Sequence, residues 1–228
     1  MEFEKQELSE QIKKKIANGL ARLNKILPLK VSQDSLSDEL QKLHRDMLHA
    51  YVDRGRSLNK AEISELVSNP EEAINTLREK DLVVFDESNE PIGAYPFTME
   101  EREHQVRVNG FKIYSMCAMD ALSISPMFKK PLEIHSQCRI SQTPIVIKQN
   151  QYGVDNLDEL SEAYFAINWN AASANTCCAD SLCTEMIFVQ GYDRAQLWLE
   201  EDPENREIYT LPEAIFFGAG FFVPLVQN

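Results

Sequence analysis

The sequence predicts an α+β protein with two parts. Residues 1–98 are expected to form N-terminal helices and a winged-helix-like module, and residues 99–228 a mixed, mainly antiparallel sheet with flanking helices. Three observations support this prediction. Apolar residues recur at helical spacing in the N-terminal part, an Asn–Gly turn joins two short alternating runs at Asn109–Gly110, and further short runs follow, separated by Gly, Pro and Asn.

The N-terminal elements are amphipathic. Residues 2–26 predict a helix that Pro28 ends, with its apolar face formed by Leu8, Ile12, Ile16, Leu20 and Leu23. A second helix is expected to begin at a cap provided by Ser35 or Ser37, with one face formed by Leu36, Leu40, Leu43, Met47 and Leu48.

Residues 35–98 resemble a winged helix. After the second helix comes the short helix AEISELV, then a helix that opens at Asn69–Pro70, and then a two-stranded ribbon, LVVFDES–NEPIGAYPF. One interpretation is DNA binding through the helix of residues 71–80, and the other is a structural or interaction module. The formal net charge of −13 favours the second interpretation, because phosphate binding needs an excess of Lys and Arg. We therefore expect no nucleic-acid partner.

From residue 103 the pattern changes to strands. HQVRV–NG–FKIYS predicts a hairpin, and a helix is expected from Met116 to Ser123. Further strands are predicted at 132–138, 144–148, 164–169 and 185–190, a loop or short helix at 171–182, a helix at 194–201, and a last apolar segment at 211–226.

Composition predicts a cytoplasmic protein. No stretch approaches the roughly 20 apolar residues of a membrane helix, and the N-terminus MEFEKQELSEQIKKK lacks the apolar core of a signal peptide. Five cysteines in such a chain are expected to be reduced thiols. Cys177, Cys178 and Cys183 fall within seven residues, and composition does not explain that clustering.

Two cysteine segments are candidates for chemistry. In Cys117–Ala–Met–Asp120 the thiol and the carboxylate share one helix face, and a helix N-terminus would lower the thiol pKa. The alternative is a buried structural Cys beside a helix-capping Asp. Thiols as dense as those of Cys177, Cys178 and Cys183 suit soft cations, although zinc-site spacing is missing. The remaining candidates are interpreted as ordinary packing or surface residues: His44, His49, His104, His135 and Cys138.

Three blocks together resemble the alkylmercury (organomercurial) lyase family. NGFKIYSMCAMDALSI is similar to the family's Tyr-x-x-Cys-Ala-x-Asp-x-Leu segment, and HSQCRISQTPI to its Ser-x-Cys-x-x-Ser/Thr-Gly-x-Pro strand. SLCTEMIFV with Trp198 resembles its second cysteine segment. The likeness covers roughly residues 40–225, including the winged-helix-like module that such proteins carry.

The resemblance implies a carbon–mercury lyase that releases a hydrocarbon and inorganic Hg(II), for mercuric resistance and detoxification. It assigns Cys117 and Asp120 as catalytic and Cys138 as structural. The gap-free match from Ser181 to Trp198 favours Cys183 over Cys177 as the second catalytic cysteine. The same three residues, Cys117, Asp120 and Cys183, would hold the mercury.

The implied reaction needs no organic cofactor, with mercury bound only as substrate and product. The expected partners are the organomercurial, low-molecular-weight thiols and a mercuric reductase that accepts the ion, with no membrane. Cys177 and Cys178 are further candidate mercury ligands that could relay the ion outward.

The chain also departs from the family pattern. Leu182 replaces an aromatic residue, Thr184 follows the cysteine, and Cys177 and Cys178 are additional thiols. One alternative is therefore a lyase for another organometallic compound. Another is a non-catalytic thiol-based soft-metal binding protein or metalloregulator. Asp120 argues against a pure binder, because a soft-metal site has no evident need for a carboxylate three residues from its thiol.

Overall fold

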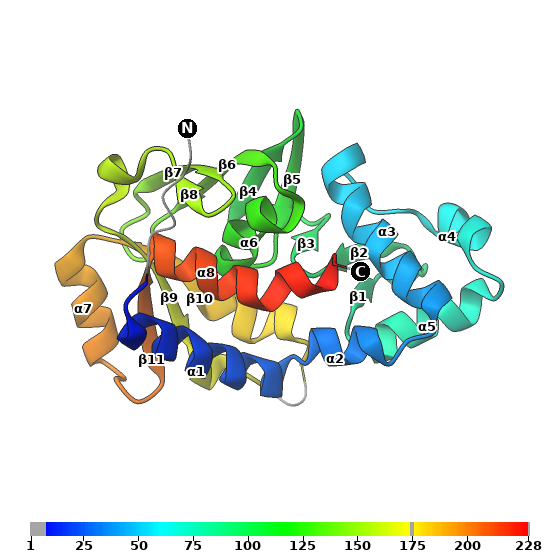
Figure 1. Cartoon of the computed structure of the whole chain (residues 1–228), viewed down its shortest axis with the longest axis horizontal. Coiled ribbons are helices and arrows are strands. Elements are labelled where there is room, and N and C mark those ends of the chain that lie inside the picture. Colours follow the sequence, from blue (N-terminus) through cyan, green and yellow to red (C-terminus); the bar gives the residue numbers. More distant parts are fainter. Residues whose placement is uncertain (1–7, 174–175, 228) are drawn as a thin grey trace.

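The computed structural model describes residues 8–173 and 176–227 (Figure 1). Within these residues the strands form an eight-stranded sheet, in the order β1-β2-β3-β5-β4-β6-β7-β8, and a three-stranded sheet, in the order β10-β9-β11. All the pairings are antiparallel. The predicted α+β class is confirmed.

Helices dominate the N-terminal part of the described chain. They are α1 (Glu10–Ile26), α2 (Leu29–Asp34), α3 (Asp38–Arg54), α4 (Lys60–Leu66) and α5 (Pro70–Glu79). Side-chain caps fix where several begin, because Ser9, Ser37 and Asn59 each accept a backbone N–H of the first turn. Ser37, and not Ser35, caps α3. The predicted first helix thus begins at Glu10, and its expected part at residues 2–7 lies outside the described residues.

After these helices the chain forms a ribbon at one edge of the eight-stranded sheet. β1 (Val83–Phe85) pairs with β2 (Pro91–Ala94), and β2 pairs with β3 (Phe97–Thr98). β3 in turn pairs with β5, so the eight-stranded sheet continues across the predicted boundary between residues 98 and 99. The order of three helices and a ribbon is as predicted, while the winged-helix classification and the domain division remain predictions.

The predicted hairpin is present. β4 (His104–Val108) pairs with β5 (Phe111–Ser115), with Val108 opposite Phe111. Asn109 and Gly110 both have positive φ, 51° and 82°, which a tight two-residue turn requires. β6 (Pro131–Gln137), β7 (Pro144–Asn150) and β8 (Gly153–Val154) extend the sheet beyond β4. β5 ends at Ser115, and the next helix begins three residues later, at Ala118.

The second sheet and its helices complete the fold. The strands are β9 (Ala163–Asn168), β10 (Met186–Gln190) and β11 (Arg206–Thr210), and the helices are α7 (Tyr192–Glu200) and α8 (Leu211–Phe222). Short 3-10 turns are η1 (Leu157–Leu160), η2 (Trp169–Ala171), η3 (Cys178–Asp180), η4 (Leu182–Glu185) and η5 (Val223–Leu225). The turns η3 and η4 fall in the segment predicted as a loop or short helix.

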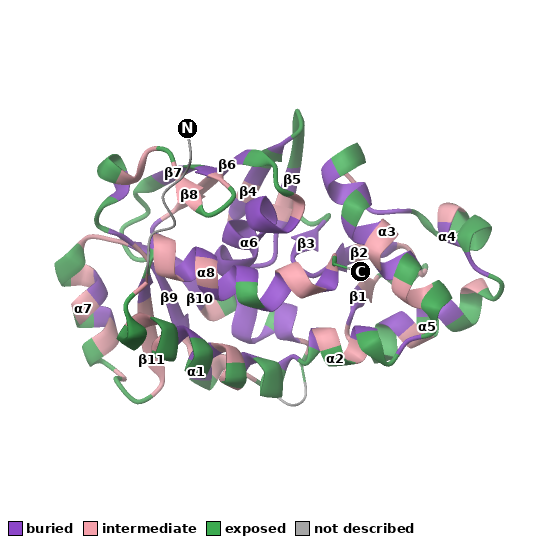
Figure 2. Cartoon of the chain, viewed as in Figure 1, coloured by how far each residue is buried: buried purple, intermediate pink, exposed green. Residues whose placement is uncertain are grey.

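One helix occupies the centre of the molecule. α6 (Ala118–Phe128) packs on β4 to β7 and against α8, and it also contacts β10. Every residue from Ala118 to Met127 is buried, as Figure 2 shows. Close packing with α8 depends on Gly218, because a Cβ there would collide with the Ser123 hydroxyl and lie 3.2 Å from the Met119 carbonyl oxygen. The buried start of α6 is where the cysteine-rich segment meets the main sheet.

Candidate active site

The first thiol of the candidate site caps the central helix. Cys117 lies in extended conformation just after β5, and its Sγ accepts the backbone N–H of Asp120 at 3.4 Å. Ser, Thr, Asp or Asn usually fills this capping position. This hydrogen bond joins the capping residue, Cys117, to the third helical residue, Asp120. It therefore fixes the backbone positions from which the thiol and the carboxylate extend.

Cys183 completes a three-residue cluster. The ligand atoms of Cys117, Asp120 and Cys183 all lie within 4.8 Å of one another, although Cys183 comes from η4, far along the sequence. Their exposed fractions are 0%, 1% and 4%. Among the described residues these three form the one group of His, Cys, Asp or Glu side chains whose geometry suits a bound metal ion. The structure thus brings together the three residues assigned from the sequence.

The carboxylate of Asp120 is held in an unusual state. Burial raises its pKa to about 8, and this outweighs hydrogen bonding with Cys117 and the charge of Arg102, which both act to lower it. Its Oδ2 atom is buried and has no hydrogen-bond partner among the described residues. Near neutral pH Asp120 is therefore mainly a neutral acid, and one of its oxygens is free of hydrogen bonds to the described residues.

The thiols are also held in their protonated form, which corrects one expectation from the sequence. A helix N-terminus was expected to lower the pKa of Cys117, but burial raises it to about 11. The pKa of Cys183 is raised well above its usual value by hydrogen bonding with Cys117 and with Cys178, and by burial. Desolvation is stronger here than the helix dipole, because the thiolate would be wholly removed from water.

This chemistry selects a particular class of ligand. A hard cation prefers oxygen ligands, whereas soft sulfur selects soft cations. Sγ of Cys117 also lies 3.5 Å from Sδ of Met186, which adds a thioether to the surroundings. A soft cation that binds here displaces the thiol protons, because a coordinating thiol is deprotonated. In the metal-free site the thiols of Cys117 and Cys183 are therefore protonated, and metal binding would release their protons.

A short turn, η3, contacts the cluster through Cys178 and is held by hydrogen bonds with two distant side chains. The hydroxyl of Tyr95 accepts the N–H of Ala179 at 3.0 Å. The guanidinium of Arg102 donates to the carbonyl of Ala179 at 2.8 Å and to Asp180 at 3.0 Å. Cys178, on this turn, places its Sγ 3.7 Å from Sγ of Cys183. Sequence reasoning missed Tyr95, Arg102 and Met186, because no local motif indicates which distant side chains hold η3.

Two cavities flank η3. One, of about 360 Å³, is lined by Ile26, Asp81, Ser173, Thr176, Cys177, Cys178 and Ser181. The other, of about 70 Å³, is bordered by residues that include Met116, Arg102 and Ala179. Residues of η3 therefore line both cavities.

The fifth cysteine lies apart from this group. Sγ of Cys138 accepts the backbone N–H of Ser141 at 3.4 Å and that of Gln190 at 3.3 Å. Its burial acts to raise the pKa, but hydrogen bonds from Ser141 and Gln190 outweigh it and the net shift is downward. Cys138 therefore joins the β6–β7 loop to β10, and its purely structural role remains a prediction.

The histidines have their own partners. Nδ1 of His44 lies 2.9 Å from Gln33 Nε2, and Nδ1 of His104 lies 2.8 Å from the Ser136 hydroxyl. Burial lowers the pKa of His44 to about 4 and of His104 to about 3. His49 packs edge-on against Phe128, and His135 contacts Glu133. None belongs to a candidate metal group among the described residues, in agreement with the sequence interpretation.

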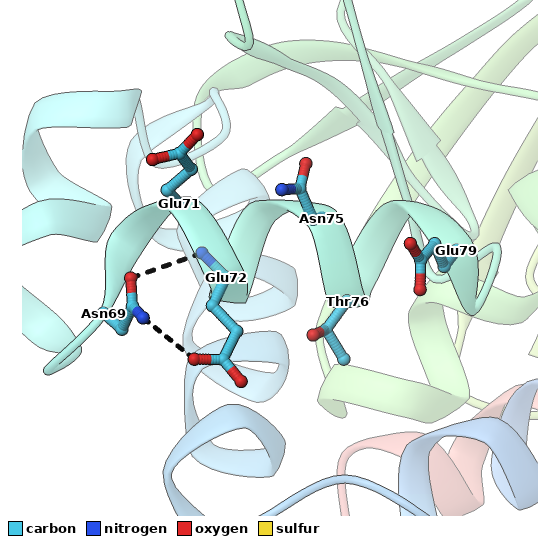
Figure 3. A pocket seen from close by; sticks show the side chains of 6 residues that line it. All are labelled: Asn69, Glu71, Glu72, Asn75, Thr76 and Glu79. Atoms are coloured by element: carbon cyan, nitrogen blue, oxygen red, sulfur yellow. Dashed lines mark hydrogen bonds between the residues drawn. The ribbon is translucent and has the colours of Figure 1, made fainter.

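The predicted recognition helix α5 has an acidic outer face. A surface hollow along it is lined by Asn69, Glu71, Glu72, Asn75, Thr76 and Glu79 (Figure 3). Asn69 caps the helix, because its side chain accepts the backbone N–H of Glu72 and donates to the Glu72 carboxylate. Carboxylates along this face repel phosphate, so the geometry favours a structural or interaction role for the module.

Comparisons with known proteins agree on one family. The family model described as alkylmercury lyase matches residues 97–223, which is more than half of the 228 residues and includes all three residues of the cluster. An alkylmercury lyase of Streptomyces lividans is 22% identical over 151 residues, which cover 66% of this chain and 68% of that protein. An alkylmercury lyase of Bacillus cereus is 21% identical over 153 residues, covering 67% and 68%.

A solved structure has the same fold. The crystal structure of the mercury-bound form of MerB2 matches with a TM-score of 0.71 at 18% identity, and the match covers 91% of this chain and 100% of that chain. No helix within residues 8–173 and 176–227 is long and apolar enough to cross a membrane.

Proposed function

The chain belongs to the alkylmercury lyase family, and on that premise we propose that its cluster of Cys117, Asp120 and Cys183 cleaves the carbon–mercury bond of an organomercurial. The reaction is a protonolysis that yields a hydrocarbon and inorganic Hg(II). The observation that carries the assignment of residues is the convergence of two buried thiols and one buried carboxylate within 4.8 Å.

The first step is thiol exchange. The organomercurial arrives with a low-molecular-weight thiolate on the metal. Cys117 forms a sulfur–mercury bond as the bond to the incoming thiolate breaks, and the Cys117 proton leaves with that thiol. No oxidation state changes. Met186, 3.5 Å from Cys117, keeps the surroundings soft and apolar.

The second step breaks the carbon–mercury bond. Asp120, a neutral acid near neutral pH, donates its proton to the carbon from an oxygen that no other described group engages. The carbon–mercury electron pair forms the new carbon–hydrogen bond. Cys183 bonds to the mercury and passes its proton to the Asp120 carboxylate, so Asp120 ends as it began. The products are a hydrocarbon and Hg(II) held by two thiolates.

Burial makes this order of events favourable. In a low-dielectric site the ionised carboxylate and thiolates are costly, so the protons stay in place until a cation compensates for their loss. The electron-donating thiolate of Cys117 on the mercury also makes the bound carbon a better proton acceptor. The cluster therefore couples metal capture to proton delivery.

The wider setting is part of the same proposal. The reaction as written uses no organic cofactor, and it needs a reducing compartment and small thiols, as in the cytoplasm. A mercuric reductase would accept the inorganic ion, and the acidic face of α5 supports a module that does not bind nucleic acid.

Turnover measurements test the proposal. The protein is incubated with phenylmercury and excess low-molecular-weight thiol, and benzene is measured. Wild type should release benzene, whereas Cys117→Ser, Cys183→Ser and Asp120→Ala should not. Cys138→Ser removes a thiol outside the cluster and should retain turnover. Release by the wild type at the uncatalysed rate would refute the assignment.

A further inference from the structure

A third thiol adjoins the cluster. Cys178 is 5% exposed, and its Sγ lies 3.7 Å from Sγ of Cys183. A soft cation bound to Cys183 therefore has the Cys178 thiol as its next sulfur neighbour. The reaction proposed above does not use this thiol, and a second cysteine, Cys177, precedes it in the chain.

The two additional thiols face a different space from the first. Cys177 and Cys178 line the cavity of about 360 Å³, whereas Cys117 is 0% exposed and is not among the residues that line it. Cys177 is partly exposed, and its Sγ–H donates to the Asp180 carboxylate at 3.3 Å. The thiols thus form a series from a wholly buried position to a cavity wall.

The cavity is suited to a polar acceptor. Besides Ile26 and the two cysteines, the residues that line it are Asp81 and three hydroxyl residues, Ser173, Thr176 and Ser181. Cys178 belongs to the buried apolar core, and it also contacts another thiol at a point where it lines this cavity.

We propose that Cys178 and Cys177 form an exit route that carries inorganic mercury from the buried site to the cavity, where a small thiol collects it. This route rests on the proposed function, because it handles the product of that reaction. It adds a metal-binding site that the cleavage step does not require.

Each transfer is a ligand exchange without redox change. Mercury begins on Cys117 and Cys183. The bond to Cys178 forms as the bond to Cys117 breaks, and the Cys178 proton passes to Cys117. The bond to Cys177 then forms as the bond to Cys183 breaks, with the Cys177 proton passing to Cys183. Two molecules of external thiol finally take the ion and return both protons.

Transfer from loaded protein tests the route without any organomercurial. Reduced full-length protein is loaded with one equivalent of mercuric chloride and mixed with excess glutathione, and the mercury that remains bound to the protein is measured after rapid desalting at successive times. Cys178→Ser should slow the transfer by about tenfold, the scale on which neighbours of metal ligands commonly act. Cys177→Ser should slow it as well, and Cys138→Ser should transfer at the wild-type rate.

A second measurement distinguishes the loss of a mercury ligand from misfolding of the variant. Mercury X-ray absorption should detect a third sulfur near the ion in wild type and two sulfurs in Cys178→Ser, with one equivalent bound in both. Equal transfer rates in wild type, Cys177→Ser and Cys178→Ser would overturn the route, and so would a defect confined to Cys177→Ser. A wild type that releases no benzene refutes the proposed function alone, because these rates use inorganic mercury.

Discussion

The backbone N–H of Asp120 donates to Sγ of Cys117 at 3.4 Å, so the first thiol of the site is also the cap of the helix that carries the carboxylate. One hydrogen bond therefore sets the local geometry of two of the three reactive groups. The third, Cys183, is brought to them by the tertiary fold.

Replacing Asp120 by Asn should separate cleavage from metal binding. Asn has nearly the same shape but no acidic proton, so benzene release should fall by about 100-fold or more, the usual contribution of a positioned acid. Cys117 and Cys183 remain, so one equivalent of Hg(II) should still bind. Isothermal titration with mercuric chloride and single-turnover benzene release measure the two quantities. If Hg(II) binding and benzene release were lost together, the role of Asp120 as the proton donor would be contradicted.

The pKa of Asp120 predicts a pH dependence of stability in the metal-free protein. The folded-state pKa is about 8, against about 3.9 in an unfolded chain. Between these values the unfolded state loses the proton that the folded state retains, so this residue lowers the stability progressively as pH rises from about 4 through about 8.

Comparison of wild type with Asp120→Asn isolates this effect. The Asn variant cannot ionise, so its stability relative to wild type should increase between pH 5 and pH 8. Urea unfolding at both values measures the difference. The pKa values of Cys117 and Cys183 are raised from a reference of 9, so these thiols contribute only at higher pH. A difference that does not change with pH would show that Asp120 is ionised in the folded protein.

Gly218→Ala should disturb the packing between α8 and α6 and so reduce both stability and turnover. The new Cβ would meet the Ser123 hydroxyl and the Met119 carbonyl of α6, the helix that carries Asp120. Overpacking of this kind destabilises by about 1–3 kcal/mol, although Ala is intrinsically favoured over Gly in a helix by about 1 kcal/mol. We expect a lower free energy of unfolding in urea and reduced benzene release.

Gly220→Ala on the same helix is the matched control. Its Cβ would lie 2.9 Å from Leu20 Cδ1, the far end of a flexible side chain that can move aside. This variant should be as stable as wild type or more stable. If Gly218→Ala behaves in the same way, tight packing between α6 and α8 does not position the reactive groups.

The acidic face of α5 predicts no DNA binding. The protein, with or without mercuric chloride, should not retard a mixed-sequence duplex in a gel at physiological salt, because the face of residues 71–79 presents carboxylates. A retarded complex that weakens steeply with added salt would instead favour a metalloregulator.

The sequence predicted the local elements well where turn and cap chemistry determines them. The Asn109–Gly110 hairpin and the start of α5 at Pro70 are examples. The helix after Cys117 was expected to end at Ser123 but continues to Phe128, with Pro126 inside it. β11 (Arg206–Thr210) was not predicted, because its pairing with β9 is determined by the tertiary fold.

The candidate site divides in the same way. Cys117 and Asp120 were paired by their spacing, and Cys183 by similarity to a family segment. The proximity of Cys178 to Cys183 and the hydrogen bonds of η3 with Tyr95 and Arg102 depend on distant segments, so no local pattern reveals them. The direction of the Cys117 pKa shift was wrong, because the sequence indicates a helix start but not its complete burial.

Isotope incorporation in a single turnover tests the central claim most directly. Protein equilibrated in D₂O is mixed with one equivalent of phenylmercury, and the benzene is analysed by mass spectrometry together with the protein-bound Hg(II). Protonolysis by exchangeable groups predicts singly deuterated benzene and inorganic mercury in equal amounts, at a rate far above that of the Asp120→Asn variant. Unlabelled benzene, or none above the uncatalysed background, would contradict it.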